Sequence, residues 1–123
     1  MVVKADGSSA RICLVVEDEA PILRLVLLVL RGMGCYALGA PDAESALQVL
    51  NFVKPDLIIT DVRLPGMSGD ELARQLKSDP ELAGTPIVLM SAFGEPPGHN
   101  GDDFLDKPFD PDQLPDFLAR YVS

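Results

Sequence analysis

The chain has 123 residues, 47% of them hydrophobic, and its 19 acidic and 10 basic residues give a formal net charge of −9. This length fits one compact domain with a hydrophobic core, and the acidic balance argues against a nucleic-acid-binding surface and favours a cation or a basic partner. The longest apolar run, within residues 22–30, is broken by Arg24 and is far shorter than the ~20 residues of a membrane-spanning helix, so we expect a soluble, cytoplasmic protein.

Residues 1–10, MVVKADGSSA, contain one lysine and no uninterrupted apolar stretch. This is not the pattern of a secretory signal, and we expect a flexible lead-in to a single domain over residues 11–123. The two cysteines, Cys13 and Cys35, lie inside apolar runs and not in a Cys-x-x-Cys motif. Buried free thiols are therefore favoured over a disulfide or a metal site.

Short apolar runs alternate with segments of helical periodicity along the rest of the chain. In chain order the expected elements are a strand over 11–16, a helix over 20–33 ended by Gly34, a strand over 35–38, a helix over 42–51, a strand over 56–62, a helix over 68–79, strands over 86–90 and 103–107, and a helix over 111–121. Asp42, Ser68 and Asp110 are placed as N-caps, and Pro115, one turn into the last helix, is expected to cost it a backbone hydrogen bond. Strands separated by helices predict an α/β fold with a parallel, doubly wound sheet.

Chemically active residues stand where these strands end. Glu17 and Asp18 follow the first strand, and Asp61, Ser91 and Lys107 end the third, fourth and fifth. In doubly wound sheets, ligands bind at the carboxyl ends of the strands. Three carboxylates that converge there repel each other, so either one is held neutral or a cation lies among them.

The types of side chain favour a metal-assisted phosphoryl site. Carboxylate and carbonyl oxygens suit Mg²⁺ or Mn²⁺, and the chain offers no Cys/His set for zinc. Lys107 supplies a positive charge and Ser91 a hydroxyl, and both suit a phosphoryl group. A carboxylate accepts a phosphoryl group when a metal and a lysine neutralise the charge on its oxygens, which makes Asp61 the candidate nucleophile.

Four stretches of the sequence resemble the receiver domain of two-component response regulators. They are ICLVVEDE, PDLIITDVRLPGMSGDELARQLK, PIVLMSA and FLDKPF, and together they extend over nearly the whole chain. The resemblance implies a flavodoxin-like, five-stranded parallel sheet of order 2-1-3-4-5. It also implies that Asp61 accepts a phosphoryl group from a sensor histidine kinase or a histidine phosphotransfer protein, and that a conformational change then carries the signal.

The resemblance assigns further roles position by position. Asp18, Asp61 and the backbone carbonyl of Arg63 would ligate Mg²⁺, with Glu17 helping through a water molecule. Ser91 would bond a phosphoryl oxygen.

Lys107 would pair with the phosphoryl group, and its bond to Pro108 is expected to be cis. Phe104 falls where the family places an aromatic residue that changes rotamer as Ser91 is drawn toward the phosphoryl group.

The segment between Ser91 and Lys107 departs from the family pattern. Residues 91–109, SAFGEPPGHNGDDFLDKPF, hold three of the 11 prolines and three of the 10 glycines. Receivers of this family usually have a fourth helix here, and this segment is too short and too rich in helix breakers to form it. We expect that helix to be reduced or absent, the loop to be mobile, and the usual output face to be altered.

Two bulky residues stand beside the expected acceptor site. Arg63 and Phe93 each lie two residues past a site residue, and we hypothesise that they slow loss of the phosphoryl group by hindering water. His99, the only histidine, lies in the Gly/Pro-rich segment and is expected to be solvated rather than a phosphodonor.

The first helix presents an unusual surface. Its apolar face predicts packing against the sheet through Ile22, Val26, Val29, Leu30 and Met33. Leu27 and Leu28 are then predicted to point outward between two arginines, as a surface for a partner or for homodimerisation.

The leading interpretation is a phosphoacceptor domain that catalyses only its own phosphorylation and dephosphorylation and is not a conventional enzyme, with no output domain expected to follow. The alternative is an interaction or dimerisation module that keeps the receiver fold and works without phosphate. A phosphatase would need a carboxylate where Arg63 stands. A flavin site would need a Ser/Thr/Gly-rich loop where EDEAP follows the first strand.

Overall fold

The computed structural model describes residues 9–122, so most of the lead-in expected over residues 1–10 lies outside the described part. The strands are β1 (Ile12–Val16), β2 (Tyr36–Ala40), β3 (Leu57–Asp61), β4 (Ile87–Ser91) and β5 (Asp103–Asp106). The helices are α1 (Ala20–Gly32), α2 (Ala43–Leu50), α3 (Gly69–Lys77) and α4 (Leu114–Val122). No helix within residues 9–122 has the length and apolar character needed to cross a membrane.

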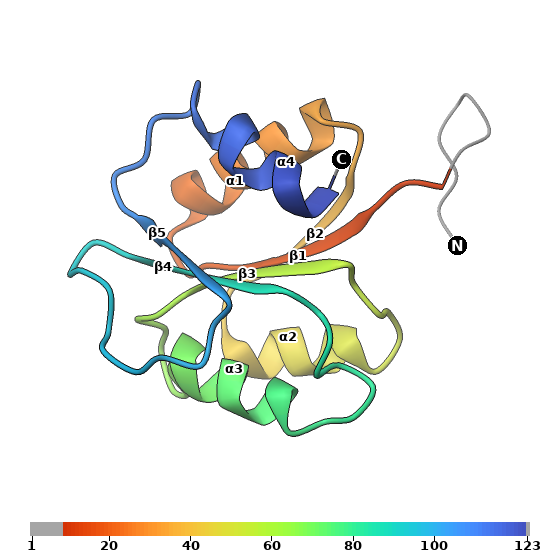
Figure 1. Cartoon of the computed structure of the whole chain (residues 1–123), viewed down its shortest axis with the longest axis vertical. Coiled ribbons are helices and arrows are strands. Elements are labelled where there is room, and N and C mark those ends of the chain that lie inside the picture. The colour runs from red at the N-terminus through yellow and green to blue at the C-terminus, as the bar shows by residue number, and fades with distance from the viewer. Residues whose placement is uncertain (1–8, 123) are drawn as a thin grey trace.

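The five strands form one parallel sheet in the order β2-β1-β3-β4-β5. Helices α1 and α4 cover one face, and α2 and α3 cover the other (Figure 1). The predicted doubly wound α/β fold and its strand order are therefore confirmed. Since all strands run in one direction, their carboxyl ends meet at a single edge of the sheet.

Local signals explain where the helices begin and end. Asp42 Oδ1 accepts a hydrogen bond from Ser45 N at 2.7 Å, and Ser68 Oγ accepts one from Glu71 N at 3.1 Å, which confirms both caps. Gly34, just past α1, has a φ of 86°, the left-handed conformation in which helices commonly end.

Several predicted boundaries differ from the observed ones, and two of the differences have a clear cause. The last helix begins at Leu114 and not at residue 111, because a turn held by Asp110 Oδ1 and Asp112 N at 2.9 Å precedes it. Pro115 then lies in the first helical turn, where its missing N–H removes no helical hydrogen bond. β2 extends to Ala40 and not only to residue 38, because its pairing with β1 continues to Val16.

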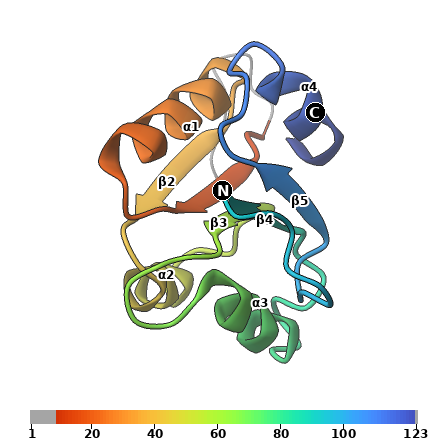
Figure 2. The ribbon, with the colours of Figure 1, turned by 90° about the vertical axis from the view of Figure 1, so that its left-hand side faces the viewer.

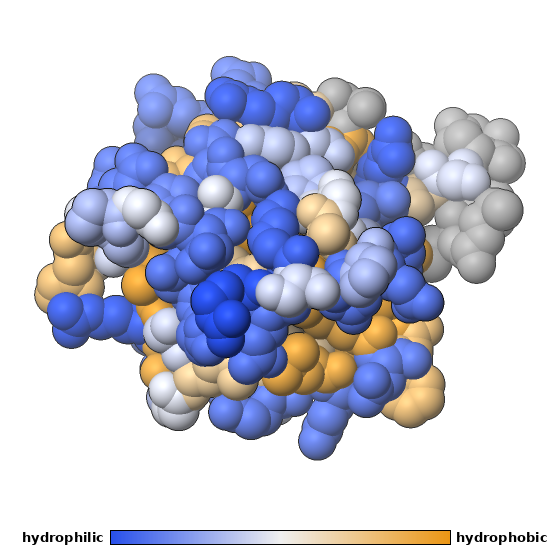
Figure 3. Space-filling model, turned by 60° about the horizontal axis from the view of Figure 1, so that its bottom comes forward, coloured by the Kyte–Doolittle hydropathy of each residue, from blue (hydrophilic) through white to orange (hydrophobic). Residues whose placement is uncertain are grey.

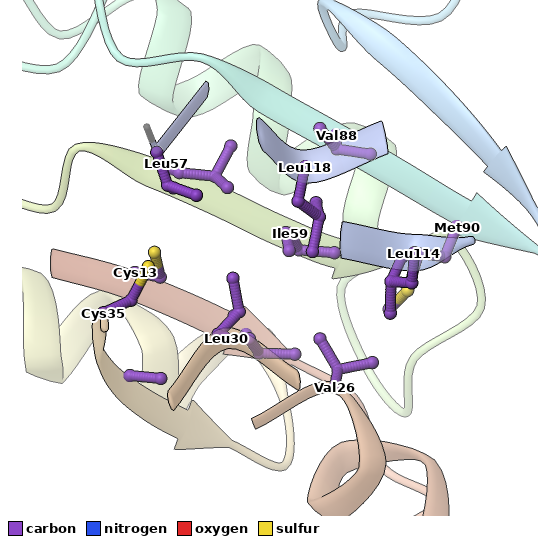
Figure 4. Packing of buried hydrophobic residues seen from close by; sticks show 13 residues of the cluster. Cys13, Val26, Leu30, Cys35, Leu57, Ile59, Val88, Met90, Leu114 and Leu118 are labelled. Atoms are coloured by element: carbon purple, nitrogen blue, oxygen red, sulfur yellow. The ribbon is translucent and has the colours of Figure 1, made fainter. Parts of the chain in front are cut away.

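Two buried clusters hold the layers together, one on each face of the sheet. Figure 4 shows the cluster beneath α1 and α4, where Val26 and Leu30 face Leu114 and Leu118 across side chains from the strands. Cys13 and Cys35 lie in this cluster as buried thiols that form no disulfide, as predicted. Burial, with a smaller contribution from the neighbouring thiol, raises the pKa of Cys13 far above its usual range.

The opposite face carries α2 and α3. Figure 3 shows that the surface on this side is hydrophilic over much of its area, with apolar side chains gathered toward the lower edge of the view. Among the described residues, the large apolar side chains that remain exposed are scattered over several elements: Leu28, Tyr36, Phe52 and Phe93.

No helix lies between β4 and β5, since residues 92–102, all of them described, form only bends and turns. The expected loss of this helix is confirmed. The segment nevertheless contacts both ends of α3. Near the start of the helix, Asp70 Oδ1 accepts hydrogen bonds from Asn100 N at 2.7 Å and Asn100 Nδ2 at 3.1 Å. Lys77 Nζ pairs with Asp102 Oδ2 at 2.6 Å, and that same oxygen accepts from Ile87 N at 2.8 Å.

Leu118→Ala is expected to lower the free energy of unfolding by about 3 kcal/mol, because it leaves a cavity in the core beneath α4. Leu118 is 0% exposed, whereas Leu28 on α1 is 65% exposed. Leu28→Ala makes the same chemical change at the surface and should alter stability by less than about 0.5 kcal/mol. Urea denaturation of both variants measures the difference, and equal losses would show that α4 does not close the core.

Candidate functional site

The candidate site lies at the edge of the sheet where all five strands end, the edge that faces the viewer in Figure 2. Glu17 and Asp18 follow β1, Asp61 and Ser91 are the last residues of β3 and β4, and Lys107 follows β5. The structure therefore brings to one edge residues that lie far apart in the sequence.

Three carboxylates converge there. Glu17, Asp18 and Asp61 each present an oxygen, and these three oxygens lie within 4.8 Å of one another. Glu17 and Asp61 are buried, whereas Asp18 is exposed. Three hard oxygen donors so close together, one of them open to solvent, form a donor set that suits Mg²⁺ or Mn²⁺.

Lys107 lies against two of these carboxylates. Its Nζ is 2.8 Å from Glu17 Oε2 and 3.3 Å from Asp61 Oδ2, and its side chain is only 8% exposed. Burial alone, the largest single effect, would lower the pKa of Lys107. The two carboxylates together outweigh burial and raise this pKa above its ordinary value, so the lysine is held charged.

The positive charge of Lys107 does not neutralise the negative charge of all three carboxylates. Burial raises the pKa of Asp61, opposed by Lys107 and by a hydrogen bond from the backbone N–H of Arg63. Burial also raises the pKa of Glu17, again opposed by Lys107. Glu17 Oε2, although 2.8 Å from Lys107 Nζ, receives no well-aligned hydrogen bond from the described residues. The cluster therefore retains an excess of negative charge that a divalent cation would neutralise, so the residues present fit the metal.

Ser91, the last residue of the neighbouring strand β4, adds a hydroxyl group to the site. In the pairing of β3 with β4, Asp61 is opposite Met90, and Ser91 follows directly. Ser91 is 3% exposed, and its Oγ accepts a hydrogen bond from Phe93 N at 3.0 Å. Its hydroxyl hydrogen is left to donate to an oxygen at the site.

Arg63 and Phe93 are in direct contact beside the site. The Arg63 guanidinium carbon lies 3.9 Å from the centre of the Phe93 ring, and the ring is 72% exposed. A guanidinium over an aromatic face is a favourable cation–π contact. Both residues were expected near the site from the sequence. The only sign that they would stack is that each lies two residues after the last residue of a strand, and that the two strands, β3 and β4, are neighbours in the sheet.

The close contact of Gly69 with Asp61 was not predicted from the sequence. A Cβ added to Gly69 would lie 1.9 Å from the backbone oxygen of Asp61, so α3 begins in direct contact with the backbone of the candidate nucleophile. The available signal was a glycine immediately after the Ser68 cap, at a position where most residues are tolerated.

The prediction that His99 is solvated was wrong. Its side chain is 11% exposed, and its ring lies 6.3 Å from the Phe104 ring. Nδ1 accepts from Gly101 N at 3.1 Å, so Nε2 is the nitrogen that donates to Glu95 Oε2 at 2.7 Å. The His99 ring therefore packs beside the Phe104 ring.

The prediction that Leu27 points outward was also wrong. Leu27 is half-buried and packs on the cluster beneath α1, where its Cδ1 would lie 3.2 Å from a Cβ on Gly39. The absence of a side chain at Gly39 in β2 makes room for it.

Leu28 is exposed as predicted, while Phe104 is half-buried against the core on the side of α3. The bond between Lys107 and Pro108 is cis, as predicted.

Comparison with known proteins gives concordant results. A sequence profile described as response regulator receiver domain matches residues 13–119. The phosphate regulon transcriptional regulatory protein PhoB of Pseudomonas aeruginosa is 40% identical over 107 residues, which cover 82% of this chain and 47% of PhoB. The chain thus spans about half the length of the curated relatives that it matches.

Solved structures of receivers share the fold of this chain. A chemotaxis response regulator of Vibrio cholerae has a TM-score of 0.85 and 27% identity, with 93% of this chain and 100% of that chain covered. The signal receiver domain of a histidine kinase from Syntrophus aciditrophicus has a TM-score of 0.84 and 30% identity, with coverage of 91% and 89%. The response regulator TrrA of Thermotoga maritima, in complex with Mg²⁺-BeF, has a TM-score of 0.81 and 27% identity, with coverage of 91% and 99%.

Proposed function

The chain belongs to the receiver domain family of response regulators, and we propose that it is a phosphoacceptor that takes a phosphoryl group onto Asp61. The donor is the phosphohistidine of a sensor histidine kinase or of a histidine phosphotransfer protein. A bond forms between an Asp61 carboxylate oxygen and phosphorus as the bond from phosphorus to the donor imidazole breaks, and the imidazole keeps the electron pair and takes up a proton.

The observation that carries this proposal is the position of Lys107 between two buried carboxylates, 3.3 Å from Asp61 Oδ2. A buried, charged lysine beside the acceptor is suited to pair with a phosphoryl oxygen once the transfer has begun. Ser91, with a hydroxyl hydrogen left to donate, is placed to bond another oxygen.

The reaction is proposed to depend on Mg²⁺ or Mn²⁺, held by Asp18, Asp61 and the backbone carbonyl of Arg63, with Glu17 acting through water. When bound, the cation supplies positive charge that offsets the charge on the phosphoryl oxygens and on the carboxylates. The complex of TrrA with Mg²⁺-BeF supports this assignment. The alternative of a module that works without phosphate is less well supported, because this chain keeps the acceptor, the acidic pair and the lysine.

Incubation with acetyl phosphate and Mg²⁺ tests the proposal. We expect a mass increase of one phosphoryl group on Asp61, lost when EDTA replaces Mg²⁺ and absent in Asp61→Asn. An equal adduct in Asp61→Asn, or none in the wild type, would overturn it.

Phe93→Ala is expected to speed loss of the phosphoryl group several-fold, because the ring and the guanidinium of Arg63 together hinder water at the site. The decay of the phosphorylated form, followed after removal of the donor, measures this effect. Phe52→Ala removes a ring that is 90% exposed at the end of α2 and serves as the matched control. An unchanged decay in Phe93→Ala would refute the role of the stack.

The exposed part of α1 is proposed as a partner surface. Receiver domains interact with histidine kinases or phosphotransfer proteins, and Leu28 presents 65% of its surface beside the exposed Arg24. Leu28→Glu is expected to slow phosphotransfer from a cognate kinase while leaving phosphorylation by acetyl phosphate unchanged. Undiminished transfer, together with a monomeric state in sedimentation, would remove both the docking and the homodimer interpretations.

A further inference from the structure

The backbone carbonyl of Asp61 is tightly enclosed by Thr60 and by Gly69, the first residue of α3. Thr60 is fully buried, and its Oγ1 donates a hydrogen bond to Asp61 O at 3.0 Å. A Cβ on Gly69 would lie 1.9 Å from Asp61 O and 2.9 Å from Thr60 Oγ1. Both separations are inside the ~3.5 Å of ordinary contact, so any side chain at Gly69 would force the backbone of Asp61 or the start of α3 to move.

The requirement for glycine at this position is one of space. Gly69 does not belong to the described glycines with positive φ, which are Gly34, Gly66, Gly94 and Gly98. Gly69 N also donates to Val62 O at 2.9 Å. The first residue of α3 therefore lies against the backbone carbonyls of both Asp61 and Val62. The Ser68 cap fixes the start of the helix, and the helix in turn fixes this stretch of backbone.

We propose that Thr60 and Gly69 are positioning residues for Asp61. By fixing its carbonyl from two sides they direct its carboxylate toward Lys107 Nζ, 3.3 Å away, and toward the acidic pair. The inference rests on the proposed role of Asp61 as acceptor. Its consequence is kinetic, because a misplacement of about 1 Å at a reacting group lowers the rate by about 100-fold.

Gly69→Ala is the first test, with Gly84→Ala as its matched control, since a Cβ on Gly84 meets nothing within 4 Å. Phosphorylation is measured against acetyl phosphate concentration at saturating Mg²⁺, well below the melting temperature of each variant. We expect Gly69→Ala to lower the maximal rate constant by about 100-fold, with little change in the half-saturating concentration. Gly84→Ala should change neither.

Thr60→Val and Thr60→Ser are a second pair of variants, which change the packing around Asp61 less than Gly69→Ala does. Valine keeps the shape of the buried side chain but cannot donate to Asp61 O, whereas serine keeps the donor and loses only a methyl group. We expect valine to lower the maximal rate constant by about tenfold, equivalent to one lost hydrogen bond, and serine to restore most of it. This pair decides the question even if Gly69→Ala fails to fold.

A crystal structure of Gly69→Ala or Thr60→Val separates this inference from the proposed function, because it requires no phosphoryl chemistry. The distance from Asp61 Oδ2 to Lys107 Nζ should exceed the 3.3 Å of the wild type. An unchanged distance, a wild-type rate constant in Gly69→Ala, or a Thr60→Ser variant as slow as Thr60→Val would each overturn the positioning role. If the wild type forms no adduct, the proposed function fails, and the variant structures still decide whether the position of Asp61 depends on Thr60 and Gly69.

Discussion

Lys107→Met is expected to lower the rate of phosphorylation at Asp61 by at least about 100-fold and the free energy of unfolding by about 3 kcal/mol. Lys107 is the cation that contacts both buried carboxylates, at 2.8 and 3.3 Å. Methionine has a similar length and fills the same space, so the change removes charge more than volume. Without the lysine, Glu17, Asp18 and Asp61 face one another, and no other cation from residues 9–122 is paired with Glu17 or Asp61.

Lys54→Met is the matched control for this variant. Lys54 is exposed and lies beyond the amino-terminal end of β3, at the edge of the sheet opposite the site. Its replacement makes the same change in net charge and should leave both quantities close to those of the wild type. Acetyl phosphate kinetics and urea denaturation measure the two effects. A Lys107→Met variant that is phosphorylated at the wild-type rate would show that the lysine has no part in the transfer.

Asp61→Asn is expected to abolish the phosphoryl adduct and, at the same time, to raise the free energy of unfolding at neutral pH. Asp61 is 5% exposed, and burial raises its pKa despite Lys107. A raised folded-state pKa means that the native protein favours the neutral form, so ionised Asp61 weakens the fold above the unfolded pKa. Asparagine has nearly the same shape and no charge, and it therefore removes this penalty.

The stability of Asp61→Asn is measured by urea denaturation in the absence of Mg²⁺. Asp18→Asn is the control from the same cluster, because Asp18 is exposed and should contribute less to the burial penalty. A variant less stable than the wild type would mean that the ion pair with Lys107 outweighs the cost of burying the carboxylate. The two results together, a lost adduct and a more stable fold, distinguish a functional carboxylate from a structural one.

The fold and the grouping of the candidate site residues at one edge could be predicted because their signals are local. Most of the strands are short apolar runs, each of α2 and α3 has a capping residue, and parallel strands place the residues at their carboxyl ends on one edge. Asp61 and Lys107 could therefore be expected together even though many residues separate them. The break in helical pattern between Phe93 and Asp102 likewise predicted the missing helix, because proline and glycine act on their own segment.

The features that were missed depend on which segments meet in space. Leu27 has helical periodicity that points it outward, yet it packs inward because a glycine in β2 leaves room for it. His99 lies in a segment rich in glycine and proline, and only the return of that segment toward β5 buries its ring against Phe104. Gly69 is required by the backbone of Asp61, which no periodicity reveals. The end of β2 follows from its pairing with β1 and not from its own composition.

We propose Asp61 as the phosphoacceptor, assisted by Lys107, Ser91 and a cation. A crystal structure of the chain with Mg²⁺ and beryllofluoride tests it most directly, because this compound mimics an aspartyl phosphate without being hydrolysed. We expect beryllium bonded to an Asp61 carboxylate oxygen, one fluorine within hydrogen-bond distance of Lys107 Nζ, another within hydrogen-bond distance of Ser91 Oγ, and Mg²⁺ on Asp18 and Asp61. Beryllofluoride bound at another residue, or a site that stays empty at saturating concentrations, would contradict it.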